Sequence, residues 1–301
     1  MTPGGVPFVD AHVHLWNLSR LRYAWLTPPF TDGGPNGNVS TIATTYLPAD
    51  YAREAANWPV AAYVHVEAGA DPAQALEETA WLEDLGDGPA GIVAFAALDH
   101  PDLNELLRAQ VTHGRVRGVR HITNWHRDPC RTYTPRDVTG DEDWQRGFAM
   151  LANHLLSFDC QAYPGQFPRL ASLFERHPNI PVIVNHAGMG VGSDRQGVAE
   201  WRAGMTALAA LRHVAVKVSG LGFVWRPIDR AAAIDRVRET LEIFGADRVL
   251  VASDFPTDRL FGSFDDILGL IADATADLSD ADRRAVWGRN ADRLYRLGLS
   301  I

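Results

Sequence analysis

The chain has 301 residues, 46% of them hydrophobic, which is enough to bury a large core. Its formal net charge of −9 argues against nucleic acid as a partner. The two cysteines, Cys130 and Cys160, are too few for a disulfide framework, and no apolar run reaches the roughly 18 residues of a membrane span. With no signal peptide evident after Met1, we expect a protein of the cytoplasm that binds neither nucleic acid nor membranes.

Short apolar runs rich in β-branched residues alternate with helix-periodic segments along the chain. The eight predicted strands are Pro7–His14, Val60–Glu67, Gly91–Ala97, Val116–Ile122, Ser157–Tyr163, Pro181–His186, Val214–Ser219 and Arg248–Asp254. The predicted helices are Pro72–Leu85, Pro101–Thr112, Asp143–Leu156, Phe167–His177, Arg195–Leu211, Arg230–Phe244 and Ser279–Leu297. This alternation predicts a single α/β domain over residues 1–301, folded as a closed (β/α)8 TIM barrel. A doubly wound open sheet is the alternative, but no glycine-rich dinucleotide fingerprint follows the first strand.

The first predicted strand ends in the sequence V-D-A-H-V-H. Because side chains alternate along a strand, we expect Asp10, His12 and His14 to share one face, with apolar residues on the other. Two imidazoles two residues apart can both reach one metal ion or one substrate oxygen. The strand therefore predicts a site at its carboxyl end.

Two connections are unusually long, and both follow predicted strands. Residues 16–46 include Trp25, and residues 123–140 include Trp125, His126 and Tyr133. Long ordered loops often cover binding sites, and loops that follow strands form the active face of a barrel. We expect both loops at the mouth of the site.

Polar side chains stand at the carboxyl ends of several other predicted strands. They are His65, Glu67, Arg120, His121, Gln161, Tyr163, Asn185, His186, Ser253 and Asp254. Because parallel strands end at the same rim of a barrel, we expect these groups to gather there. Arg120 and His121 alternate, so one of them should point inward; Arg120 is our choice and His121 the second.

At this point the chain resembles a family. V-D-A-H-V-H, N-H-A-G and A-S-D-F-P resemble motifs of the amidohydrolase superfamily. R-H-I-T-N-W-H, S-F-D-C-Q-A-Y, D-R-L-F-G-S-F and N-A-D-R-L-Y-R-L resemble its lactonase branch, which holds sugar-lactone and pyrone-dicarboxylate lactonases. The resemblance runs from Phe8 to Leu297.

The resemblance implies roles for four residues. His12 and His14 match the strand-1 pair, His186 matches the strand-6 histidine, and Asp254 matches the aspartate that orients or deprotonates the attacking water. Some relatives hold two metals bridged by a carboxylated strand-4 lysine. Here the only lysine is Lys217, on the predicted seventh strand, and the fifth strand carries Gln161 and Tyr163 in place of a ligand histidine. A binuclear site is therefore not expected.

Two versions of the site remain open. In one, a single divalent ion such as Zn²⁺ is held by His12, His14, His186 and Asp254, lowers the pKa of its bound water towards ~7 and polarises the carbonyl. In the other, Asp254 is the general base and the histidines with Arg120 stabilise the oxyanion. A lactone is an activated ester, and some of the lactonase branch work without metal, which favours the metal-free version at a site still able to bind metal.

The substrate-binding candidates come from strand ends and from the loops that follow them. They are Arg120, His121, Trp125, His126, Gln161, Tyr163 and Trp225. We expect a hydrolase that opens a small-molecule lactone. A metal-dependent decarboxylase of the same superfamily, a hydrolase of amides or simple esters, and a barrel that binds a small molecule without turnover are the alternatives. Assembly into a homo-oligomer stays open.

Overall fold

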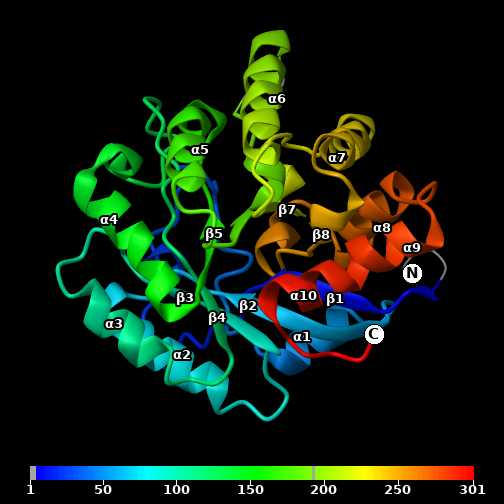
Figure 1. Cartoon of the computed structure of the whole chain (residues 1–301). Helices are drawn as coiled ribbons and strands as arrows, with labels where there is room; N and C mark the ends of the chain where they lie inside the picture. The colour runs from blue at the N-terminus through cyan, green and yellow to red at the C-terminus, as the bar shows by residue number, and fades with distance from the viewer. Residues whose placement is uncertain (1–4, 192–193) are drawn as a thin grey trace.

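The computed structural model describes residues 5–191 and 194–301. Eight parallel strands form one sheet in sequence order, with helices around the outside, so the predicted TIM barrel is confirmed (Figure 1). The strands are β1 Phe8–Val13, β2 Val60–Val66, β3 Gly91–Phe95, β4 Val116–Arg120, β5 Ser157–Cys160, β6 Val182–Val184, β7 Val214–Val218 and β8 Val249–Val251. Beyond β8, Val13 and Phe255 form a parallel bridge, and the Asp254 amide donates to the His12 carbonyl oxygen at 2.9 Å. These bonds bring the ends of β1 and β8 together.

Ten α-helices with named bounds surround this barrel in the described part of the chain. They are α1 Pro48–Glu54, α2 Ala75–Glu83, α3 Leu103–Gln110, α4 Glu142–Met150, α5 Phe167–Glu175, α6 Arg195–Ala209, α7 Arg230–Phe244, α8 Phe264–Ala274, α9 Asp280–Arg284 and α10 Asn290–Tyr295. None of them is both long and apolar enough to cross a membrane. The expected helix 279–297 is divided, because a π-helical stretch, Ala285–Arg289, separates α9 from α10.

Two helices were not predicted. Helix α1 lies between the first long connection and β2 and has only seven residues, too few to show a helical period. Helix α8 begins with a signal that the sequence does contain: Ser263 accepts from the Asp266 amide, and the Asp266 carboxylate accepts from the Ser263 amide. Such a reciprocal cap satisfies two of the free N–H groups at a helix start.

The first strand departs from regular alternation. Val9 and Ala11 pack with Ile183 and Leu250 in the apolar cluster inside the barrel, whereas Asp10 accepts a hydrogen bond of 2.9 Å from Tyr51 of α1. The prediction that Asp10 shares a face with the two histidines is therefore wrong. The pairing of β1 with β2 shifts register between Asp10 and Val13, and such a bulge re-aims the side chains that follow it.

Predicted strands extend into the turns that carry the polar residues. β6 ends at Val184 and β8 at Val251, so His186 and Asp254 lie beyond the sheet. Both have positive φ, 54° and 58° respectively, a conformation that non-glycine residues rarely adopt. The chain thus turns sharply at these two positions, where strained residues often serve a function.

The helical glycines test the packing of helices on the barrel. A Cβ at Gly147 in α4 would lie 1.8 Å from the Leu98 carbonyl oxygen, whereas nothing lies within 4 Å of a Cβ at Gly269 in α8. We expect Gly147→Ala to destabilise the protein by about 1–3 kcal/mol or more, and Gly269→Ala to stabilise it by about 0.5–1 kcal/mol. Thermal unfolding of both variants checks this, and equal shifts would contradict the packing described.

Candidate active site

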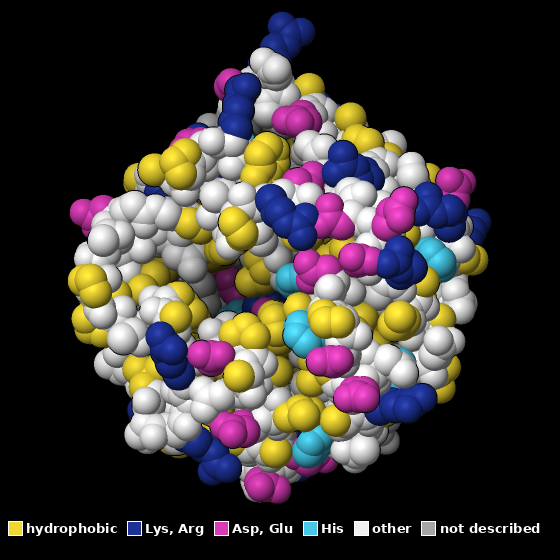
Figure 2. Space-filling model, turned by 90° about the vertical axis from the view of Figure 1, so that its left-hand side faces the viewer, with side chains coloured by type: hydrophobic (Ala, Val, Ile, Leu, Met, Phe, Trp, Pro, Cys, Tyr) yellow, Lys and Arg dark blue, Asp and Glu magenta, His cyan; other side chains and the backbone are white. Residues whose placement is uncertain are grey.

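A cavity of about 200 Å³ opens at the carboxyl ends of the strands. Figure 2 views this face and shows a hollow with histidine and acidic side chains on its floor. The lining residues come from strand ends and from both long loops. They are His14, Trp25, Asn36, Ala68, Gly69, Arg120, Ile122, Tyr133, Gln161, His186, Phe223, Asp254 and Thr257.

Three buried side chains meet at the floor of this cavity: His14 and Asp254 line it, and His12 contacts both without lining it. The Nε2 atoms of His12 and His14 lie 3.2 Å apart. Oδ1 of Asp254 lies 3.4 Å from Nε2 of His12 and 3.3 Å from that of His14. The histidines follow the bulge in β1 and Asp254 follows β8, so closure of the barrel assembles the cluster.

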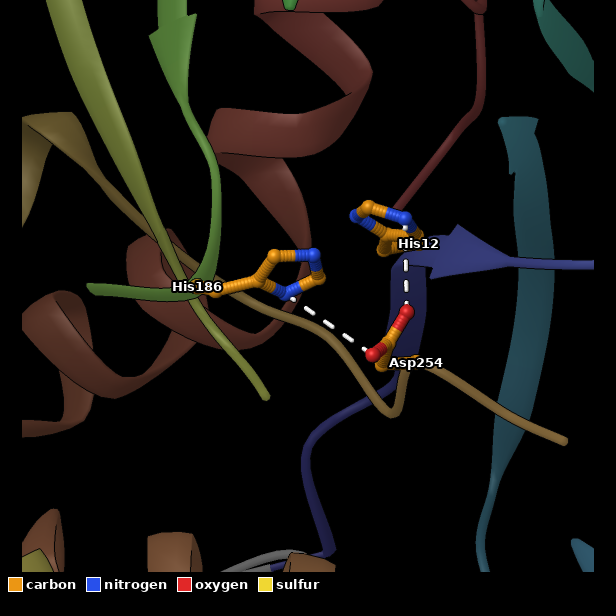
Figure 3. Close-up of side chains that lie close together, drawn as sticks. All are labelled: His12, His186 and Asp254. Atoms are coloured by element: carbon orange, nitrogen blue, oxygen red, sulfur yellow. Dashed lines mark ion pairs between the residues drawn. The ribbon is translucent and has the colours of Figure 1, made fainter. Parts of the chain in front are cut away.

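His186 approaches the same carboxylate from the turn after β6 (Figure 3). Its Nδ1 lies 3.8 Å from Oδ2 of Asp254 and 3.0 Å from the Ser219 hydroxyl oxygen. Gly220 makes room for the ring, since a Cβ there would lie 2.5 Å from that nitrogen. Gly220 also has a φ of 59°, which glycine adopts without strain.

Arg120 enters from the end of β4 and is almost fully buried. Its Nε and Nη2 donate to Oε1 and the carbonyl oxygen of Glu67, both at 2.6 Å, and Nη1 donates to Oε1 of Gln161 at 2.8 Å. Nη1 also lies 3.4 Å from Nε2 of His12. The guanidinium is therefore fixed, and Glu67 compensates its charge.

A second acid stands behind Glu67. Oε1 of Glu78, on α2, accepts from the Tyr23 hydroxyl at 3.2 Å and from the Ala68 amide at 3.3 Å. Burial, reinforced by the charge of Glu67, raises the pKa of Glu78 to about 8. Glu78 thus favours the protonated form in the folded protein at neutral pH.

The surroundings lower the pKa of the Asp254 carboxyl group and also the pKa values of the His12 and His186 rings. Burial alone would raise the pKa of Asp254, but His186, His14 and Arg120 outweigh it and hold that pKa below its ordinary value. Burial, with the nearby positive charges, lowers the pKa of His12 well below its ordinary value and that of His186 to about 4. At neutral pH an ionised carboxylate therefore faces neutral rings at His12 and His186.

The donor set fits a divalent ion by residue type and spacing. Ligand atoms of His12, His186 and Asp254 lie within 4.8 Å of one another, and no other such group of three occurs among the residues described. Neither carboxylate oxygen of Asp254 has a hydrogen-bond partner, although both are buried. Two histidines and a carboxylate are common zinc ligands. His14 contacts this trio through His12 and Asp254.

The predicted substrate-binding residues divide into two groups. Arg120 and Gln161 line the cavity. His121 turns away from it, because its Nδ1 accepts from the Leu98 amide at 3.2 Å and from Trp144 Nε1 at 3.1 Å. Tyr163 lines a neighbouring cavity of about 460 Å³.

The predicted loop aromatics also lie outside the inner cavity. Trp125 is 38% exposed. The ring of His126 packs on that of Tyr163, with centroids 6.2 Å apart, and Trp225 packs on the Arg236 guanidinium at 5.2 Å. None of these three residues lines the inner cavity.

Eight cavity residues were not among the predicted site residues: Trp25, Asn36, Ala68, Gly69, Ile122, Tyr133, Phe223 and Thr257. Trp25 donates to the Ala68 carbonyl oxygen at 2.8 Å, and the Tyr133 hydroxyl donates to Oδ1 of Asn36 at 2.6 Å. The second bond joins the two long loops across the mouth. Loop length was the available signal, but it does not reveal which loop side chains turn inward.

Comparison with known proteins places this geometry in a family. The family model described as amidohydrolase matches residues 9–297. The chain is 34% identical to the uncharacterized protein y4mH of Sinorhizobium fredii, over 97% of this chain and 99% of that protein. It is 29% identical to an L-fucono-1,5-lactonase of Burkholderia multivorans, over 96% of each. The crystal structure of an amidohydrolase from Burkholderia multivorans with bound zinc is 28% identical, with a TM-score of 0.79 over 96% of this chain and 99% of that one.

Glu78 generates a pH-dependent prediction. Its pKa of about 8 in the folded state exceeds the ordinary value of 4.5, so its contribution to stability is complete below about pH 4.5 and is lost as the pH rises through about 8. Relative to wild type, Glu78→Gln should gain more than about 1 kcal/mol of stability between about pH 5 and about pH 9. Urea unfolding at both pH values measures this gain.

The exposed neighbour Glu77→Gln is the matched control. Its stability difference from wild type should be the same at both pH values. A Glu78→Gln difference that stays constant with pH would contradict the assignment.

Proposed function

Because the chain belongs to the amidohydrolase family, a family of hydrolases, we propose that it opens a small-molecule lactone by attack of water. The observation that carries the proposal is the buried Asp254 carboxylate, ionised and without hydrogen-bond partners, at the floor of the cavity. The similarity to L-fucono-1,5-lactonases supports the cyclic ester as the bond that is broken. A decarboxylase, an amide or simple-ester hydrolase, and a non-catalytic binding barrel are outcomes of the tests below.

In the proposed reaction Asp254 takes a proton from the attacking water and returns it to the ring oxygen as the lactone C–O bond breaks, which leaves a hydroxy acid. Its free oxygens can accept that hydrogen bond, and its pKa keeps it ionised at neutral pH. Arg120 lines the same cavity, where its N–H groups can stabilise the charge that develops on the carbonyl oxygen, and His12 lies behind it with Nε2 3.4 Å from Nη1. His186 lies on the other side of the carboxylate, with Nδ1 3.8 Å from Oδ2 of Asp254, and Ser219 contacts that same Nδ1 at 3.0 Å.

A divalent ion, when bound by His12, His186 and Asp254, would supply Lewis-acid polarisation of the scissile carbonyl. The roles of the side chains described above do not depend on that ion. We propose at most one such ion, since the trio is the one group of this spacing among the described residues. All the residues proposed to bind the substrate belong to this one chain, so the proposal includes no partner protein.

The lining of the cavity favours a neutral polyhydroxylated ring. The one guanidinium in it, Arg120, is already paired with Glu67, so a carboxylate on the substrate would find no unpaired arginine among the lining residues. Asn36, Tyr133 and Thr257 offer hydrogen bonds to hydroxyl groups. We therefore propose a sugar lactone in preference to a pyrone dicarboxylate.

The test is a pH-indicator hydrolysis panel of sugar lactones, pyrone-dicarboxylate lactone, simple esters and amides. We expect sugar lactones to be hydrolysed fastest. Faster hydrolysis of the pyrone lactone, of esters or of amides would overturn the proposed substrate class. Release of CO₂ from carboxylated substrates would support a decarboxylase instead.

Each panel is run with and without a chelator. We expect kcat to fall by less than about tenfold, or about 1.4 kcal/mol in the barrier, after chelation. A larger loss that Zn²⁺ or Mn²⁺ restores would show that turnover requires a metal ion.

Asp254→Asn tests the general base. Asparagine tolerates positive φ, so the turn is preserved while the proton acceptor is lost. We expect kcat to fall by about 10²-fold or more. The matched control is Asp229→Asn, an exposed N-cap of α7 at which asparagine caps equally well. Near-normal turnover by Asp254→Asn would remove Asp254 from this role.

A further inference from the structure

Lys217 is the only lysine in the chain, and it is fully buried beneath the site. Its Nζ lies 2.5 Å from Oδ2 of Asp159 on β5, and the Tyr295 hydroxyl of α10 donates to both oxygens of that carboxylate, at 2.9 and 3.0 Å. The same Nζ lies 3.5 Å from Nδ1 of His12. A buried ammonium therefore contacts the side of the His12 ring that faces away from the cavity.

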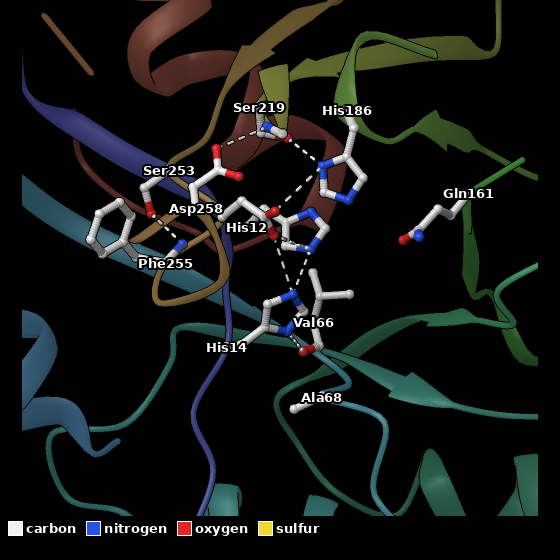
Figure 4. Close-up of polar contacts among 12 residues, drawn as sticks. His12, His14, Val66, Ala68, Gln161, His186, Ser219, Ser253, Phe255 and Asp258 are labelled. Carbon is white, nitrogen blue, oxygen red and sulfur yellow. Dashed lines mark hydrogen bonds and ion pairs between the residues drawn. The ribbon is translucent and has the colours of Figure 1, made fainter. Parts of the chain in front are cut away.

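The other end of the His12–His14 pair determines one tautomer. Nδ1 of His14 lies 2.8 Å from the Val66 carbonyl oxygen, which can only accept (Figure 4). His14 therefore donates from Nδ1. Nε2 of His12 lies 3.2 Å from Nε2 of His14 and 3.4 Å from Oδ1 of Asp254, a carboxylate oxygen that can only accept, so a hydrogen on Nε2 of His12 has an acceptor here.

The contact between Lys217 and Nδ1 of His12 also places the hydrogen of His12 on Nε2. An ammonium can only donate, so Nδ1 of His12 must be the acceptor and its hydrogen must sit on Nε2. Donors and acceptors then alternate from Lys217 through His12 and His14 to Val66.

Arg120 is the one competing donor, since Nη1 lies 3.4 Å from Nε2 of His12. That nitrogen already donates to Gln161 at 2.8 Å, and the rest of the guanidinium is bound to Glu67. Arg120 is therefore satisfied without a lone pair on His12.

We propose that Lys217 is a positioning residue that holds His12 in the tautomer with its hydrogen on Nε2. His12 then presents the hydrogen on Nε2 to Nε2 of His14 and Oδ1 of Asp254, which lie 3.2 and 3.4 Å away. Ligation of a metal through Nε2 requires the opposite tautomer, which would place a hydrogen on Nδ1 against the ammonium. Lys217 thus weakens metal binding through His12.

The residue type fits this role. A compact ammonium has three hydrogens that can point in different directions, whereas a guanidinium is a planar fork suited to paired oxygens. At Lys217 the acceptors are Asp159 on one side and a single ring nitrogen on the other. Arginine supplies all the other cationic side chains apart from histidine, so the lysine stands out.

Zinc affinity tests the proposal without any substrate. The double variant Lys217→Met/Asp159→Asn removes both charges together, so no unpaired carboxylate stays buried. We expect its Kd for Zn²⁺, measured by competition with a chromogenic chelator, to be lower than that of wild type by about tenfold or more, the range in which groups behind a ligand histidine act. Unchanged or weaker zinc binding would overturn the proposal.

Tyr295→Phe is the matched control, because it removes one partner of Asp159 but keeps the Lys217 ammonium beside His12. Its zinc affinity should equal that of wild type. Tighter zinc binding in this variant would assign the effect to general loosening of the barrel interior, against the proposal.

Nitrogen NMR of metal-free wild-type protein, labelled in its histidines, gives a direct measurement that needs no variant to fold. We expect hydrogen on Nε2 of His12 and on Nδ1 of His14. Hydrogen on Nδ1 of His12 would refute the proposal. Neither the zinc titration nor the NMR measurement uses a lactone. A negative result in either would therefore count against the role of Lys217 and not against the proposed lactone hydrolysis.

Discussion

The site depends on keeping one buried carboxylate charged. Asp254 is buried, and His186, His14 and Arg120 outweigh the effect of burial and keep its pKa low. This requires the histidines that follow β6 and β1 to converge on one carboxylate. The bonds between the ends of β1 and β8, together with the turn after β6, bring them there. The fold thus balances a burial cost that no single element could meet.

Charge compensation continues below and around the floor in two buried networks. Glu67 and Gln161 hold Arg120, and Asp159 with Tyr295 holds Lys217. Each network pairs its cation, so the cavity combines strong local fields with little net positive charge. This arrangement suits a neutral substrate and a reaction in which charge appears only transiently.

The barrel could be predicted because eight apolar runs alternate with helical segments, and polar residues stand where those runs end. His12, His14, His186 and Asp254 could be proposed as neighbours for the same reason, and the structure brings them together. The bulge in β1 could not be predicted, because register depends on pairing with β2 and not on local pattern. The inward turn of Trp25 and Tyr133 depends on contacts between two loops distant in sequence. The face taken by His121 is likewise settled by its partner Trp144.

The hydrogen bond between Tyr133 and Asn36 joins the two long loops to each other, and neither residue belongs to a barrel strand. The residues proposed for catalysis lie on the barrel strands or directly after them, whereas Tyr133 and Asn36 lie on long connecting segments, which generally tolerate insertion and exchange. Substitutions confined to these loops can therefore change the shape of the cavity mouth without moving the buried residues at its floor.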